Sequence, residues 1–187
     1  VNANQVQVNS GGLITAATTG GGTGGSVNIN TGNTFSSNAG TVSSTATQDA
    51  NAGNINISAG QSVTLTNGAN ISVSSAGQGP AGDIHINAGQ NFTSTNSSVT
   101  TEANQSSGGF IKITTAPSGT VQMTDSTISA SVLDGAGGGG SINIDPQFVI
   151  LDNSKIIANS TSPIISTCRK RCCERPPVVP RAFSRTA

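Results

Sequence analysis

The sequence predicts an all-β fold: a right-handed parallel β-helix with three short strands per coil, about 5.5 coils and an unstructured C-terminal tail. The first observation behind this prediction is an aliphatic pair that recurs at a nearly constant interval. The second is a composition too poor in large side chains for an ordinary globular core, since the 187 residues include no Trp, no Tyr and five Phe against 24 Gly. A thin aliphatic core that repeats along a rod accounts for both observations.

The recurring pair has the form Ile/Val-x-Ile and returns five times, at intervals of 28, 29, 27 and 31 residues. Its members are Val27 and Ile29, Ile55 and Ile57, Ile84 and Ile86, Ile111 and Ile113, and Ile142 and Ile144. Each pair follows one or more glycines, and an apolar alternation with a period of two predicts a short strand with one buried face. We therefore expect Ile57 to lie in an interior column between Ile29 and Ile86.

Two further apolar columns recur inside each period. The first contains Phe35, Val63, Phe92, Val121 and Phe148, and the second contains Val42, Ile71, Val99, Ile128 and Ile156. Val6 and Ile14 join these columns, so the chain is expected to start in the middle of a coil. Three strands in 27 to 31 residues, separated by Gly, Asn, Asp and Ser turns, describe one coil of a triangular solenoid.

One turn column is expected to hold Asn67, Asn96, Asp125 and Asp152, because short Asx side chains tolerate left-handed backbone geometry. If Asp125 and Asp152 lie about 5 Å apart on adjacent coils, they suit a retaining glycosidase or a bridging cation. Two carboxylates in a column otherwise held by asparagine are more simply turn residues. We therefore predict no catalytic, cofactor-binding or metal-binding residue, and no cofactor.

The other candidates for chemistry are isolated from one another. His85 is the only histidine and lies between Ile84 and Ile86, so it is expected to point outward and to belong to no triad or multi-histidine metal site. Lys112 and Lys155 fall in different columns and so form no catalytic groove with the acids. These observations predict a protein that is not an enzyme.

Composition divides the chain into a repeat region, residues 1–162, and a tail, residues 163–187. The repeat region carries two basic and seven acidic side chains, whereas the tail carries six basic and one acidic. The abrupt change to Arg, Cys and Pro suggests a translated wrong reading frame or an unrelated terminus, and we expect this tail to be unstructured.

The tail also holds all three cysteines of the chain, Cys168, Cys172 and Cys173. Their C-x3-C-C spacing lacks a fourth ligand and matches no common zinc pattern. The neighbouring run Arg169-Lys170-Arg171 has no stacking aromatic beside it, so we expect no nucleic-acid partner.

Two stretches of the repeat region resemble a known family. The run GGSINIDPQFVILDNSKIIANS (residues 139–160) resembles the filamentous-haemagglutinin-like exoproteins of two-partner secretion, especially cyanobacterial ones. The run AGNINISAGQSVTLTNGANISVSSAGQGPAGD (residues 52–83) looks like the repeats of the same family, so the likeness covers most of residues 4–160.

The resemblance implies a right-handed parallel β-helix that is secreted through an outer-membrane partner transporter and acts as an adhesin on the bacterial cell surface. It supplies no catalytic residue, and the family's N-terminal secretion domain and signal peptide are not found here. We expect a structural or adhesive segment that binds surfaces, other cells or cell-surface glycans through repeated polar ladders. The alternatives are a polysaccharide-degrading enzyme on a pectinase-like β-helix and a non-functional gene fragment. Open strand edges also predict end-to-end self-association.

Overall fold

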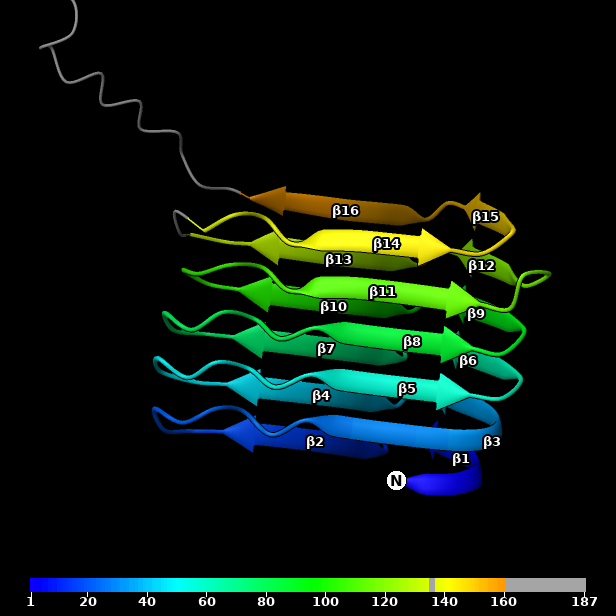
Figure 1. The fold of residues 1–187 in the computed structure, drawn as a ribbon, viewed down its shortest axis with the longest axis horizontal. Coiled ribbons are helices and arrows are strands. Elements are labelled where there is room, and N and C mark those ends of the chain that lie inside the picture. Colours follow the sequence, from blue (N-terminus) through cyan, green and yellow to red (C-terminus); the bar gives the residue numbers. More distant parts are fainter. Residues whose placement is uncertain (135–136, 161–187) are drawn as a thin grey trace, which may run out of the picture.

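The computed structural model describes residues 1–134 and 137–160, which form a parallel β-solenoid of about six turns (Figure 1). These residues contain sixteen strands and no helix. In Figure 1 the near strands run to the right, the chain then turns away from the viewer, and it returns to the left as it rises, which is a right-handed winding. The all-β solenoid prediction is thus confirmed. The predictions for the tail, residues 163–187, lie outside the described residues.

The first face of the solenoid carries the Ile/Val-x-Ile pairs. Its strands are the first half of β3 (Val27–Asn38), β5 (Ile55–Ala59), β8 (Ile84–Ala88), β11 (Phe110–Thr115) and β14 (Ser141–Asp145). Parallel pairing aligns Ile29 with Ile57 and Ile57 with Ile86, as predicted. Ile57 is 1% exposed, so this column is the interior of the rod.

The second face follows after one corner of the triangle. Its strands are β1 (Asn2–Asn9), the second half of β3, β6 (Ser62–Thr66), β9 (Asn91–Thr95), β12 (Thr120–Thr124) and β15 (Phe148–Asp152). Because β3 continues around the corner, the first and second faces form one bent ten-stranded sheet. Phe35, Val63, Phe92 and Val121 share an interior column, as predicted.

The predicted place of Phe148 in that column is wrong, because Val149 pairs with Val121 and Phe148 pairs with the outward Thr120. The length of the corner gives the reason. Six positions separate Ile57 from Val63, but only four separate Ile144 from Phe148, so Phe148 comes too early in the chain to reach the interior.

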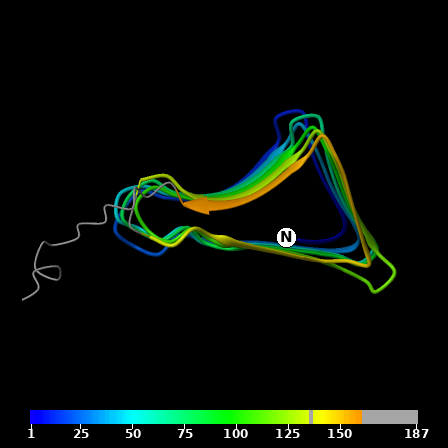
Figure 2. The same ribbon diagram turned by 90° about the horizontal axis from the view of Figure 1, so that it is seen from above.

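The third face is a separate six-stranded sheet. Its strands are β2 (Leu13–Thr18), β4 (Thr41–Ala46), β7 (Asn70–Ser75), β10 (Ser98–Ala103), β13 (Thr127–Val132) and β16 (Lys155–Ser160). Val42, Ile71, Val99, Ile128 and Ile156 pair in one register along it, as predicted. Seen from above, the three faces enclose a narrow triangle (Figure 2).

Glycine is required where the chain passes from the third face back to the first. A Cβ atom at Gly82 would lie 2.4 Å from the carbonyl oxygen of Gly53, and one at Gly53 would lie 2.1 Å from that of Gly25. Successive coils approach each other too closely here for any side chain. The recurrence of glycine before each aliphatic pair therefore has a steric cause.

The interior contains a few polar side chains on the third face. Ser44 Oγ donates to the carbonyl oxygen of Gly25 at 3.0 Å and accepts from the Gly53 amide at 3.1 Å, so it joins two coils. Thr101 lies in the same column, between Val73 and Ala130, and is fully buried. Its Oγ1 atom has no hydrogen-bond partner, which is an uncompensated cost of folding.

Candidate binding surface

The outward side chains of the first face form two polar columns, because strand pairing keeps the same alternation in every coil. The column nearer the strand starts contains Asn28, Asn56, His85, Lys112 and Asn143, and the other contains Asn30, Ser58, Asn87, Thr114 and Asp145. Hydrogen bonds run along them: Asn56 Nδ2 donates to Asn28 Oδ1 at 2.8 Å. The columns are therefore ordered along the rod axis.

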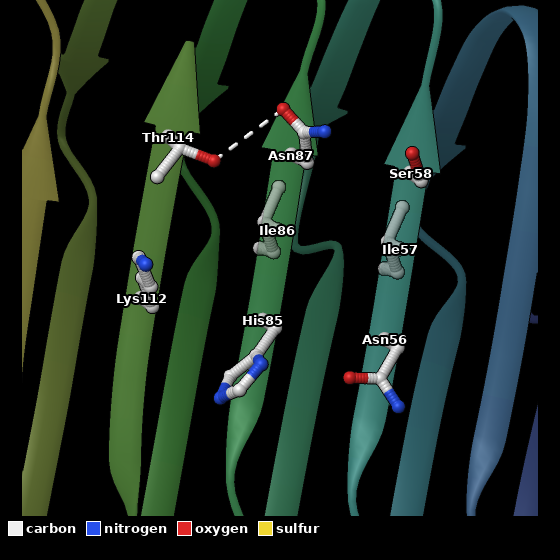
Figure 3. A pocket seen from close by; sticks show the side chains of 8 residues that line it. All are labelled: Asn56, Ile57, Ser58, His85, Ile86, Asn87, Lys112 and Thr114. Carbon is white, nitrogen blue, oxygen red and sulfur yellow. Dashed lines mark hydrogen bonds between the residues drawn. The ribbon is translucent and has the colours of Figure 1, made fainter.

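A shallow open hollow of about 270 Å³ lies on this face over β5, β8 and β11 (Figure 3). Its lining residues are Asn56, Ile57, Ser58, His85, Ile86, Asn87, Lys112 and Thr114. The polar side chains stand outward on three neighbouring strands, and Thr114 Oγ1 donates to Asn87 Oδ1 at 3.4 Å. The hollow thus offers amide, hydroxyl, imidazole and ammonium groups side by side.

His85 points outward and is exposed, as predicted from its position between Ile84 and Ile86. Its ring meets the Phe110 ring edge to face, with 5.9 Å between centroids and an angle of 85° between planes. Lys112 is the residue paired with His85 on the next strand. The His85 ring is therefore packed against Phe110, and the strand pairing places Lys112 next to His85 in the outward column.

The predicted turn column needs one correction. Asp125 pairs in the turn with Asn153, whose side-chain amide donates to the Asp125 carboxylate, whereas Asp152 pairs with Thr124 inside the strand. Asp125 and Asn153 both have positive φ angles, 49° and 46°, as do Asn67 and Asn96. Asp125 and Asp152 therefore do not stack in one column, which was the basis for considering them as a glycosidase pair or a cation site.

Among residues 1–134 and 137–160, no group of three or more His, Cys, Asp and Glu side chains is placed to hold a metal ion. The same residues include no helix long and apolar enough to cross a membrane. The Cys168, Cys172 and Cys173 cluster and the basic run beside it lie outside the described part of the chain.

The last strand of the second face is unusually apolar for an exposed position. Phe148 is 58% exposed, Val149 47%, Ile150 50% and Leu151 46%. Phe148 and Ile150 point outward, while Val149 and Leu151 continue the interior columns of the preceding coil. Strand β15 thus presents apolar side chains, and within residues 1–134 and 137–160 no strand pairs with its outer edge.

Comparison with known proteins leaves the family open. No family model matches the chain, and neither the curated proteins nor the solved structures include a match to it. The resemblance to filamentous-haemagglutinin-like exoproteins therefore stays a prediction, while the β-solenoid is compatible with a repeat protein of that kind.

Sequence reasoning missed the hollow on the first face, although the signal for it was present. Aligning the repeats on their Ile/Val-x-Ile pairs places Asn56, His85 and Lys112 at the same middle position of three successive pairs. The structure brings them together with the neighbouring Ser58, Asn87 and Thr114 column.

Proposed function

We propose that this chain is a structural and adhesive segment of a secreted or surface-displayed bacterial exoprotein, which contacts surfaces or glycans through its outward polar ladders. The observation that carries the proposal is the separation of the two sides of every strand. Inward positions are mainly apolar and buried through successive coils, whereas outward positions are mainly Asn, Thr, Ser and Gln in continuous columns, with a few charged residues such as Lys112 among them. Such a rod repeats one weak contact many times, and avidity then provides the affinity.

Within this proposal, the hollow on the first face is the part best suited to a polar ligand. Asn56 and Asn87 supply amides, Ser58 and Thr114 supply hydroxyls, and all of them lie on rigid, paired strands. Sugar hydroxyl groups can both donate to and accept from these side chains. Because the hollow is shallow and open, it suits reversible contact with an extended chain better than enclosure of a small molecule.

The proposal assigns binding rather than catalysis to the chain. Polysaccharide hydrolysis needs two carboxylates at a defined separation, and the best candidate pair, Asp125 and Asp152, does not share a column. Export through an outer-membrane partner transporter, recognised by a separate secretion domain, belongs to the same proposal and rests on the resemblance of residues 52–83 and 139–160 to two-partner secretion exoproteins.

The test is binding of the full chain to a glycan array and to whole bacterial cells. A variant with Asn56→Ala, His85→Ala and Lys112→Ala is compared with the wild type, and Asn70→Ala, Ser98→Ala and Thr127→Ala on the third face serves as the matched control. We expect the first variant to lose most of the binding and the control to retain it. Equal binding by all three proteins, or no binding by the folded wild type, would contradict the proposal.

Localisation is tested separately by detecting the native protein with an antibody. We expect signal on intact cells or in the culture medium. Signal confined to the cytoplasm would contradict surface display, and no native protein in any fraction would favour the gene-fragment alternative.

A further inference from the structure

The outward surface of the second face differs from the other two in being rich in threonine and free of charge from β3 to β12. Its outward residues there are Thr34, Ser36, Asn38, Ser62, Thr64, Thr66, Asn91, Thr93, Thr95, Thr120, Gln122 and Thr124. By contrast, His85 and Lys112 lie on the first face, and Glu102 on the third.

Strand pairing places five of these threonines in a two-column block. Thr64 pairs with Thr93, while Thr66 pairs with Thr95 and Thr95 with Thr124. Neighbouring strands are about 4.8 Å apart, and alternate residues along a strand are about 6.7 Å apart. The Cα atoms of these threonines therefore lie on a roughly rectangular lattice with two repeat distances, and their side chains point outward from it.

The threonines of the block are held in place. The second face is a nearly straight side of the triangle in Figure 2, so each of its strands is close to straight. Each threonine of the block is half-buried between its neighbours, and a β-branched side chain has few χ1 rotamers to choose from. Little conformational freedom remains to be lost when a rigid solid contacts this surface.

We propose that this surface binds ice. Ice is itself a rigid, ordered array of water molecules, so a surface that orders water on a fixed two-dimensional repeat can join such a crystal. Threonine hydroxyl groups can donate to and accept from water, while the adjacent methyl groups favour an ordered water layer around them. A charged side chain would instead hold its own hydration shell and disturb such a layer. The residues paired with Thr93 and Thr95 are uncharged, and the charged residue nearest to Thr95 in its column is Asp152, which pairs with Thr124 on the next strand.

The same observations favour ice over a neutral polysaccharide as the ligand of this face. Sugar rings present C–H groups that pack well on the faces of aromatic side chains. From β3 to β12 no outward residue of the second face is aromatic, since Phe35 and Phe92 both point into the core. The inference depends on the fold and on the second face, and it is independent of glycan binding by the first face.

The experiment measures thermal hysteresis, the gap between the freezing and melting temperatures of a small ice crystal, together with inhibition of ice recrystallisation by the full chain. Thr93→Tyr on β9 places a bulky ring in the middle of the lattice. Thr100→Tyr on β10 is the matched control, because Thr100 is also an outward, half-buried threonine of the same coil but lies on the third face. Tyrosine favours strands, and circular dichroism verifies that both variants fold.

We expect hysteresis and recrystallisation inhibition in the wild type and in Thr100→Tyr, and loss of both in Thr93→Tyr. A folded wild type without either activity would overturn the inference, as would equal loss in the two variants. Retention on crystalline cellulose or chitin without ice activity, abolished by Thr93→Tyr, would also overturn it and would identify the face as a glycan surface. Failure of the Asn56, His85 and Lys112 experiment leaves this result unaffected, because the two tests use different faces.

Discussion

Replacing Ile57 with aspartate tests the interior ladder directly, because this residue lies at the centre of the first face. Ile57 is 1% exposed and is paired on one side with Ile29 and on the other with Ile86, both of which are also buried. The substitution removes an aliphatic side chain from this column and places a carboxylate there. Its matched control is Asn56→Asp, which puts the same group one residue away on the outward side of the same strand.

The expected cost of Ile57→Asp has two parts. Loss of a fully buried isoleucine costs about 2 to 5 kcal/mol, as in large-to-small core substitutions. The remaining carboxylate has no cationic side chain in its column, and burying an unpaired charge adds several kcal/mol more unless the group becomes protonated. The sum is comparable with the whole free energy of unfolding of a typical domain, about 5 to 15 kcal/mol.

Asn56→Asp should cost far less. Asn56 is only half-buried, and the substitution removes its hydrogen bond to Asn28 Oδ1, worth about 1 kcal/mol net. The new carboxylate stays in contact with water, at an outward position whose partner on the next strand is the exposed residue His85. A small loss of stability, about 1 kcal/mol or less, is therefore expected.

The measurement is guanidinium unfolding of the full chain, followed by circular dichroism in the strand region. Because a repeat array can lose coils locally, hydrogen exchange of the β5 and β8 amides is recorded as well. We expect Ile57→Asp to abolish the cooperative transition or to expose these strands, while Asn56→Asp retains it. Equal effects of the two substitutions would mean that the assignment of inward and outward sides is wrong.

Two further predictions concern the core and the last coil. Thr101→Val should raise the free energy of unfolding by about 1 kcal/mol, because it removes a buried hydroxyl group that has no hydrogen-bond partner. Valine fits this column, since Val73 occupies the same position in the adjacent coil. A lower denaturation midpoint than in the wild type would contradict the prediction. Ser44→Ala, its control, should lower stability because the Gly53 amide loses its acceptor. Ile150→Lys should reduce self-association of the full chain, because it places a charge on the apolar strand β15. Analytical ultracentrifugation measures this, and unchanged sedimentation would rule out the edge of β15 as the contact between molecules.

The sequence predicted the interior ladders well because strand pairing in a solenoid repeats the same contact in every coil. Val42, Ile71, Val99, Ile128 and Ile156 stand in the predicted order, since polar residues flank each of the first four and leave one possible alternation. The glycine clusters were equally informative. They mark a corner where backbone meets backbone, and their spacing along the chain is therefore the length of a coil.

The sequence could not decide the register where neighbouring residues are chemically alike. Phe148, Val149, Ile150 and Leu151 are all apolar, so alternation does not say which of them point inward. Asp152 and the residue after it are both Asx, so the turn position was ambiguous by one residue for the same reason. Hydrogen bonding between β12 and β15 settles both, because a shift of one residue reverses the side to which every side chain points.

The sequence by itself determined the interior of the solenoid. Apolar residues recur with a period of two within each strand and of about 28 between coils, and these two periods predict which side chains are buried and that they stack from coil to coil. Only the tertiary structure decided the outer surface. Alignment of the repeats already places Asn56, His85 and Lys112 in one column, but the hollow over that column and the exposed threonine block around Thr93 and Thr95 are seen only in the stacked coils. Burial constrains the inward positions through the free energy of desolvation, whereas an outward residue is free to vary, so the shape of the outer surface has no comparable signal in the sequence.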